Sequence, residues 1–140
     1  MKKIILLVTL ILLGASVGLA QKKMYEPKKG SAERKALVDA IRVYDVARNS
    51  DFEGEIFKIT TLRVQGNWAF TSVERTNLPE AGEGTHMAFL QKSGAGWKVM
   101  WSSYNDNDEV GVDALVRLRK KHKDLYKELA DFAENGWLAG

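Results

Sequence analysis

The residue best suited to acid–base chemistry in this chain is His86. It follows the glycine-rich stretch Gly82 to Gly84 and opens a predicted strand. An imidazole titrates near neutral pH, so it can both accept and donate a proton during a reaction. Tyr44 or Tyr104 would supply a second proton-bearing group. The alternative is a solvent-exposed histidine at the end of a strand, with no part in any chemistry.

A second pattern is the concentration of large aromatic residues in the predicted strands, including Trp97. A curved sheet often keeps a cavity at its open end, where apolar side chains meet a small ligand. The aromatic residues could line an apolar binding pocket, but we expect them to form an ordinary packed core. The residues predicted to contact the ligand are Tyr44, Trp68, Phe70, His86 and Trp101.

Other chemistries lack the residues they need. The chain has no cysteine, and His86 and His122 are far apart, so no zinc site is expected. The acidic run 106–111 departs from the EF-hand loop, because Val110 stands at a ligand position and Arg117 replaces the bidentate acid. No Gly-x-Ser-x-Gly motif or phosphate-binding glycine loop is present. We predict neither a metal nor a cofactor.

The first twenty residues have the pattern of a secretory signal peptide. Lys2 and Lys3 precede an apolar run, and a small-residue segment ends at Ala20. The apolar run is short for a membrane span, and an N-terminal membrane anchor is the alternative. We predict cleavage near Ala20, a periplasmic or secreted product, and no stable membrane anchor afterwards.

The chain that remains after this cleavage would be almost neutral. The whole chain has 21 lysine and arginine residues against 18 aspartate and glutamate residues, and loss of Lys2 and Lys3 leaves 19 against 18. A domain without excess positive charge offers no electrostatic basis for binding nucleic acid. We therefore predict no nucleic-acid partner.

The remaining residues predict a single α+β domain over 31–138, after an extended lead-in at 21–30. Apolar residues at spacings of three and four predict a helix over 31–48, with Ser31 as its N-cap. β-Branched and aromatic runs joined by short turns predict a curved antiparallel meander. Its four strands are predicted at 55–65, 68–75, 86–92 and 97–103.

A narrow apolar seam then predicts a long amphipathic helix over 113–134, ended by Gly136. His122 lies in this seam, where a core or boundary histidine is expected rather than a ligand. The basic residues on the outer faces could contact anionic lipid or an acidic partner. Alternatively they form a solvated face with ion pairs at four-residue spacing. The candidate pairs are Lys120–Asp124 and Lys127–Asp131.

The turn at Gly66–Asn67 leaves a choice of register. Side chains alternate between faces along a strand, so loop length decides which residues share a face. A two-residue loop separates Trp68 and Phe70 from Val64, whereas a three-residue loop places all three on one face. Burial of a large apolar side chain is worth about 1.5–3 kcal/mol, more than a turn preference. We predict the three-residue loop, and we expect both faces of the sheet to be covered if the loop has two residues.

The pattern of the last strand is clearer than that of the strand before it. Trp97, Val99 and Trp101 alternate with less apolar residues, which predicts that they share one face. In the preceding strand both faces carry apolar residues, so the pattern leaves its orientation open. If Ala88 faces the core, His86 points to the same side.

Three segments of the chain resemble small bacterial secreted proteins with a cystatin-like or nuclear-transport-factor-two-like (SnoaL-like) fold. These segments are residues 27–35, the hairpin 64–70 and the Gly96–Val99 run. The resemblance implies that the first helix packs across the concave face of a curved sheet. It implies no particular chemistry, because one fold can carry many functions. The long basic helix after residue 111 departs from this pattern.

No convergent set of ionisable residues can be assembled from the sequence. We therefore predict an exported, non-enzymatic binding or protein-interaction domain, whose partner is a small apolar ligand or a protein. The alternative is a small-molecule isomerase or lyase that uses His86 as acid and base in the cavity of the sheet. A third possibility is a homodimer joined through the sheet or the seam of the last helix.

Overall fold

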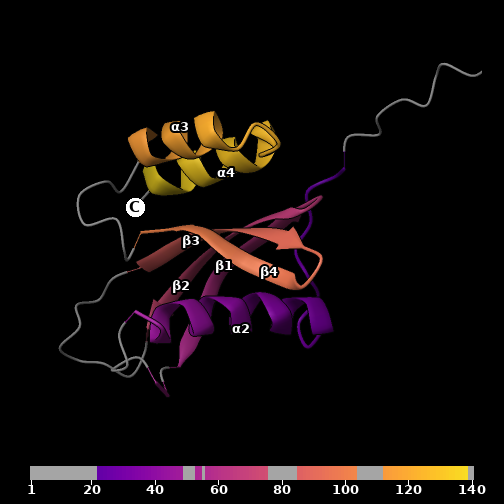
Figure 1. The fold of residues 1–140 in the computed structure, drawn as a ribbon, viewed down its shortest axis with the longest axis vertical. Helices are drawn as coiled ribbons and strands as arrows, with labels where there is room; N and C mark the ends of the chain where they lie inside the picture. The colour runs from indigo at the N-terminus through magenta and orange to yellow at the C-terminus, as the bar shows by residue number, and fades with distance from the viewer. Residues whose placement is uncertain (1–21, 49–52, 55, 76–84, 104–111, 139–140) are drawn as a thin grey trace, which may run out of the picture.

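The computed structural model describes residues 22–48, 53–54, 56–75, 85–103 and 112–138. The predicted signal peptide, Tyr104 and the acidic run 106–111 lie outside the described residues. Within them the chain forms three helices and one four-stranded antiparallel sheet, so the predicted α+β class is confirmed (Figure 1). In chain order the elements are α2 (Ala32–Val46), β1 (Phe57–Gln65), β2 (Trp68–Arg75), β3 (Thr85–Ser93), β4 (Gly96–Ser102), α3 (Val112–Lys121) and α4 (Lys127–Leu138).

The four strands form a meander in which each strand pairs with the next, in the order β1-β2-β3-β4. Helix α2 lies on one face of this sheet, and α3 and α4 lie on the other (Figure 1). Ser31 caps α2, since its hydroxyl accepts a hydrogen bond from the Arg34 amide at 3.2 Å. The sheet is therefore the middle layer of three.

Each face of the sheet carries its own hydrophobic core. The α2-side core joins Leu37 and Ile41 of the helix to strand residues that include Leu62, Val64, Ala69, Ala88, Leu90 and Val99. The C-terminal core joins Trp68, Phe70, Phe89 and Trp101 of the strands to helix residues that include Leu115, Leu118, Leu125 and Leu129. Burial on both faces removes the reason to gather all large side chains on one face.

The predicted three-residue hairpin loop is wrong. Gln65 pairs with Trp68 and Val64 pairs with Ala69, so the loop consists of Gly66 and Asn67 alone. Trp68 therefore faces away from Val64 and from α2. We expected both faces of the sheet to be covered if the loop had two residues. This expectation is confirmed, because a hydrophobic core lies on each face. The error lay in assuming a single buried face, which made burial favour the longer loop.

Two β-bulges change which residues share a face. In β1 the register shifts between Ile59 and Thr61, so Thr60 is an extra residue opposite β2. This shift lets Ile59, at an odd position, and Leu62, at an even one, both join the α2-side core. The hydroxyl of Thr60 donates to the Ser72 carbonyl across the irregularity, at 3.0 Å. In the sequence, this bulge therefore shows itself as a shift of the core-facing apolar residues of β1 from odd-numbered to even-numbered positions.

The second bulge corrects the predicted face of Trp101. Phe89 pairs with Trp101 while Leu90 pairs with Val99, so Met100 is the extra residue of β4. Val99 lies in the α2-side core, but Trp101 lies in the C-terminal core. The prediction that Trp97, Val99 and Trp101 share one face is therefore wrong for Trp101.

The single helix predicted over 113–134 is also wrong. The structure has two helices there, separated by residues 122–126, and α4 continues through Gly136 to Leu138. Apolar residues continue at spacings of three and four across the break, so this pattern could not predict that the helix is interrupted. Leu118 before the break and Leu125 within it both reach the C-terminal core.

The lead-in before α2 adds a short bridge to the outer edge of β1. Tyr25 and Val64 exchange two backbone hydrogen bonds, at 2.9 and 2.8 Å. The Glu26 carboxylate contacts Arg34 of α2 at 3.1 Å and Arg63 of β1 at 2.6 Å. The edge strand and α2 are therefore tied to the same segment, which partly covers an otherwise unpaired strand edge.

Candidate functional site

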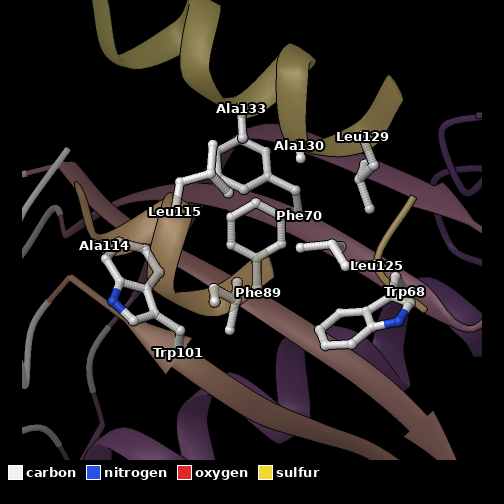
Figure 2. Packing of buried hydrophobic residues seen from close by; sticks show 11 residues of the cluster. Trp68, Phe70, Phe89, Trp101, Ala114, Leu115, Leu125, Leu129, Ala130 and Ala133 are labelled. Atoms are coloured by element: carbon white, nitrogen blue, oxygen red, sulfur yellow. The ribbon is translucent and has the colours of Figure 1, made fainter. Parts of the chain in front are cut away.

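The five residues predicted to contact a ligand do not share one site. Trp68, Phe70 and Trp101 lie in the C-terminal core, where their side chains face the two C-terminal helices (Figure 2). The ring centroids of Phe70 and Phe89 are 5.1 Å apart, and Trp68 is fully buried. These three aromatic residues pack the interior with helix side chains. Tyr44 packs against the α2-side core, across the sheet from them.

His86 belongs instead to a buried polar cluster with Asp45 and Ser102. The His86 Nε2 atom lies 2.6 Å from the Ser102 Oγ atom, and His86 Nδ1 lies 3.3 Å from Asp45 Oδ2. The Nδ1 contact has ion-pair distance but is not aligned as a hydrogen bond. The exposed fractions are 0% for Asp45, 4% for His86 and 1% for Ser102. We call these three residues the polar triad.

Three elements far apart in the sequence bring the polar triad together. Asp45 follows Leu37 and Ile41 at four-residue spacing, so it lies on the buried stripe of α2. His86 lies two residues before Ala88 on β3, and alternation gives both the same face. Ser102 pairs with Ala88 after the bulge at Met100. The polar triad is therefore built by the helix stripe, by alternation in β3 and by one bulge.

Neither Asp45 nor Ser102 was predicted from the sequence as a site residue. A signal for Asp45 was present, because an acid at the next four-residue step after Leu37 and Ile41 falls on the apolar face. A carboxylate buried there requires a polar partner. The sequence held no comparable signal for Ser102. The face on which Ser102 lies depends on the bulge at Met100, and the neighbouring residue types do not predict that bulge.

A groove with a volume of about 480 Å³ lies at the junction of α3 and α4. Two apolar side chains, Val116 and Leu125, and one histidine contribute to its walls. Its remaining described lining consists of three basic side chains, Arg119, Lys120 and Lys123, and none of the described lining residues is acidic. We call this the basic groove. Its combination of cations with apolar walls is suited to a small ligand that carries a negative charge.

His122 lies at the inner side of the basic groove, where its ring meets the Trp68 ring edge-on at 5.2 Å. Its Nε2 atom is buried and has no hydrogen-bond partner among the described residues. His122 is thus a boundary histidine packed on the C-terminal core. This agrees with the core or boundary histidine expected from the sequence, and no acidic or thiol group accompanies it among the described residues that line the groove.

Asp124, in the connection between α3 and α4, fixes this junction to the sheet. Its carboxylate accepts hydrogen bonds from the Trp68 indole at 3.0 Å, the Gln91 amide at 2.6 Å and the Asn67 amide at 3.4 Å. The predicted Lys120–Asp124 ion pair is not formed among the described residues. The other predicted pair, Lys127–Asp131, is formed at 2.5 Å.

The Asp124 contacts predict a dependence of stability on acid pH. Burial raises the pKa of Asp124, but hydrogen bonds from Trp68, Asn67, its own backbone and Gln91 outweigh burial and hold the pKa below its ordinary value of 3.8. A carboxyl whose folded pKa is depressed stabilises the fold above its unfolded pKa, and this contribution disappears as pH falls through the folded value.

We therefore expect Asp124→Asn to lower the free energy of unfolding by about 1 kcal/mol at pH 6, a value reduced for the exposure of the carboxyl. The difference from the parent protein should shrink as the pH falls below 3.8. Urea unfolding at a series of pH values between 6 and 2.5, followed by tryptophan fluorescence, measures it. A difference that stays constant down to pH 2.5 would contradict the assigned hydrogen bonds.

Comparison with known proteins adds no relative: no family model, no curated protein and no solved structure matches the chain. Within the described residues, no helix is long and apolar enough to cross a membrane. Nor do those residues gather three or more histidine, aspartate or glutamate side chains in a group that could hold a metal ion. The local geometry of the polar triad and of the basic groove therefore carries the functional argument.

Proposed function

We propose that this protein is an exported binding domain, without catalytic activity at this site, that holds a small anionic ligand in the basic groove. The observation that carries the proposal is that the described lining of the groove contains three basic side chains and no acidic one. Its volume of about 480 Å³ falls within the range of small-molecule sites. Arginine and lysine both bind carboxylates and phosphates, and arginine can do so through two parallel hydrogen bonds.

The cations of the groove are available to a ligand because their internal partners are few. Asp124 is occupied by donors from the sheet, so it does not neutralise Lys120. Arg119 has only a distant contact with Asp131, at 3.9 Å, and Asp131 is also paired with Lys127. Among the described residues, Lys120 and Lys123 take part in no ion pair. A bound anion would therefore not have to displace an existing salt bridge from either lysine.

The sequence predicted a small apolar ligand, and the apolar part of the groove is compatible with a ligand that has an apolar portion. Val116 is 55% exposed and Leu125 lies at the groove, so a short apolar chain can be covered while its charged end meets the cations. A fatty-acid-like carboxylate has this chemistry. Its apolar part would be buried on the groove rather than between α2 and the sheet, where the α2-side core already packs.

Export and family likeness remain part of the same proposal. The charged start, apolar run and small-residue segment before Gln21 support a signal peptide. The order of one helix followed by a four-stranded antiparallel meander supports a likeness to cystatin-like and nuclear-transport-factor-two-like proteins. A binding domain in the periplasm or outside the cell is consistent with both.

The second candidate is a small-molecule isomerase or lyase with His86 as acid and base, and the contacts of His86 with Asp45 and Ser102 favour it. However, both ring nitrogens of His86 face protein side chains. A proton donated or accepted by Nε2 is therefore exchanged with Ser102 before it can be exchanged with a substrate. We place this candidate second for that reason.

Binding of decanoate to the purified full chain tests the proposal. We expect saturable binding by isothermal titration, with no binding of the matched cation decyltrimethylammonium. Lys120→Glu combined with Lys123→Glu should raise the decanoate dissociation constant at least about tenfold, because two attractive charges become repulsive. Lys98→Glu, which reverses an exposed lysine of β4, should leave it within about twofold.

Three results would contradict the proposal. The first is equal binding of decanoate and decyltrimethylammonium, since this would reflect apolar contact alone. The second is a loss of affinity in Lys98→Glu as large as in the double variant, because that would reflect net charge rather than the groove. The third is a dimer in sedimentation that the double variant abolishes, which would make the groove a self-association surface.

A further inference from the structure

In the polar triad the His86 ring lies between a serine oxygen on its Nε2 side and a carboxylate on its Nδ1 side. His86 Nε2 contacts Ser102 Oγ at 2.6 Å, and His86 Nδ1 faces Asp45 at 3.3 Å. A carboxylate beside Nδ1 favours the tautomer that has its proton on Nδ1 and a lone pair on Nε2. In that tautomer, Nε2 accepts the hydrogen bond from the Ser102 hydroxyl and is ready to take its proton.

The environment of these three groups strengthens that effect. Each is at most 4% exposed, so water does not screen the interaction between the carboxylate and an imidazolium formed beside it. Asp45 is held by the helix stripe and Ser102 by strand pairing on β4, so neither group needs a large rearrangement to keep its contact with His86. Such a constellation is recognised by geometry and roles rather than by a sequence motif.

We propose that Ser102 is a nucleophile for acyl transfer from small esters, with His86 as its general base and Asp45 as a positioning residue. This activity is independent of the basic groove, which lies on the other side of the sheet. It also differs from isomerase or lyase chemistry, because the proton taken by His86 comes from Ser102 and not from a carbon of the substrate.

The reaction balances with an ester and water alone. Ser102 Oγ attacks the ester carbonyl carbon and transfers its proton to His86 Nε2. The adduct then collapses, the bond to the leaving alcohol oxygen breaks, and that oxygen takes the proton from Nε2. In the second half, water adds to the acyl carbon and gives a proton to Nε2. The carboxylic acid leaves, and the proton returns to Ser102 Oγ.

Covalent labelling by diisopropyl fluorophosphate tests the proposal on the purified full chain. We chose this reagent because it is small and Ser102 is only 1% exposed. We expect one adduct per chain by intact mass, mapped to Ser102, with release of fluoride. Ser102→Ala should abolish the adduct, and Asp45→Asn should slow its formation by a factor of about ten to a hundred.

The matched control is Ser72→Ala. Ser72 is buried on the neighbouring strand β2, but its described side-chain partner is the Thr60 hydroxyl rather than a histidine. This variant should be labelled at the same rate as the parent protein. Protein unfolded in urea should not be labelled, because a serine separated from its histidine is a poor nucleophile. This arm separates a slow variant from one that has merely unfolded.

Two results would overturn the proposal. One is a folded parent protein that remains without an adduct at Ser102, since the polar triad would then be only a structural network. The other is equal labelling of Ser72 and Ser102, because such reactivity would not depend on His86. Both results leave the proposal for the basic groove intact, since decanoate binding is measured separately.

Discussion

Replacing His86 with alanine should lower the free energy of unfolding by about 2–4 kcal/mol at pH 7, because the buried Asp45 carboxylate and the buried Ser102 hydroxyl each lose their contact with the imidazole. Asp45 is fully buried, and His86 Nδ1 lies 3.3 Å from its carboxylate. The imidazole also fills space in the interior, so the variant adds a cavity to the loss of the contact. Urea unfolding followed by tryptophan fluorescence measures the change.

The double variant Asp45→Asn with His86→Ala separates these two effects. Asparagine keeps nearly the shape of aspartate but carries no charge. We therefore expect the double variant to be more stable than His86→Ala alone, although the cavity remains. The coupling between the two substitutions should be at least about 1 kcal/mol.

The control for this cycle is Asp39→Asn on the same helix. Asp39 is 43% exposed and pairs with Lys35 on the surface. Surface pairs of this kind contribute little, so this variant should change stability by less than about 0.5 kcal/mol. A cost below 1 kcal/mol for His86→Ala, or additivity of the two substitutions, would show that the Asp45 carboxylate does not depend on His86.

The parts of the fold that could be predicted from the sequence are those set by local periodicity. Leu37 and Ile41 recur at helical spacing, and Ser31 precedes them as an N-cap, so α2 was recognisable from residue types alone. The strands of the meander were recognisable from apolar runs between short turns. Each of these signals is local, and each is repeated several times along its element.

The parts that could not be predicted depend on single residues or on contacts across the fold. One extra residue, Met100, moves Trp101 to the opposite face and determines the face of Ser102. At the break between α3 and α4, the Asp124 carboxylate accepts a hydrogen bond from the Trp68 indole of the sheet. No local sequence pattern predicts this contact or the break. The polar triad needs three elements in register at once, so its assembly is a property of the tertiary structure.

The register of the first hairpin shows how the two kinds of information compete. The three-residue loop was predicted from the burial energy of the large apolar side chains. Each of these side chains is indeed buried, but the prediction assumed that only one face of the sheet is covered. The preference of Gly-Asn for a two-residue loop pointed to the observed register. Gly66 has φ of +63°, and no non-glycine residue of the described chain has a positive φ. A loop with glycine alone in this conformation at its first central position matches a type II′ turn.

Gly66→Ala should consequently be among the most destabilising small substitutions in the chain, at about 2–4 kcal/mol. A side chain at this φ costs about 1–2 kcal/mol. In addition, a Cβ atom at position 66 would lie only 2.7 Å from the Tyr126 Cζ atom, well inside van der Waals contact. Crowding of this kind typically costs about 1–3 kcal/mol, and less if the ring can move outward.

The turn between β3 and β4 supplies two matched controls for this substitution. Gly96 has φ of +130° with open space around a built Cβ, so Gly96→Ala should cost only the backbone strain of about 1–2 kcal/mol. Gly94 has no positive φ and also faces open space, so Gly94→Ala should stay within about 0.5 kcal/mol of the parent protein. Urea unfolding of the three variants under one condition gives the order directly.

The Tyr126→Ala background isolates the contact between the hairpin and the α3–α4 connection. In that background, Gly66→Ala should cost only as much as Gly96→Ala does in the parent protein, because the ring that would clash is gone. An equal cost for Gly66→Ala with and without Tyr126 would mean that this ring does not lie against the turn. The two-residue loop would then lack its contact with the C-terminal helices, and the covering of the sheet's second face at this end would have to be revised.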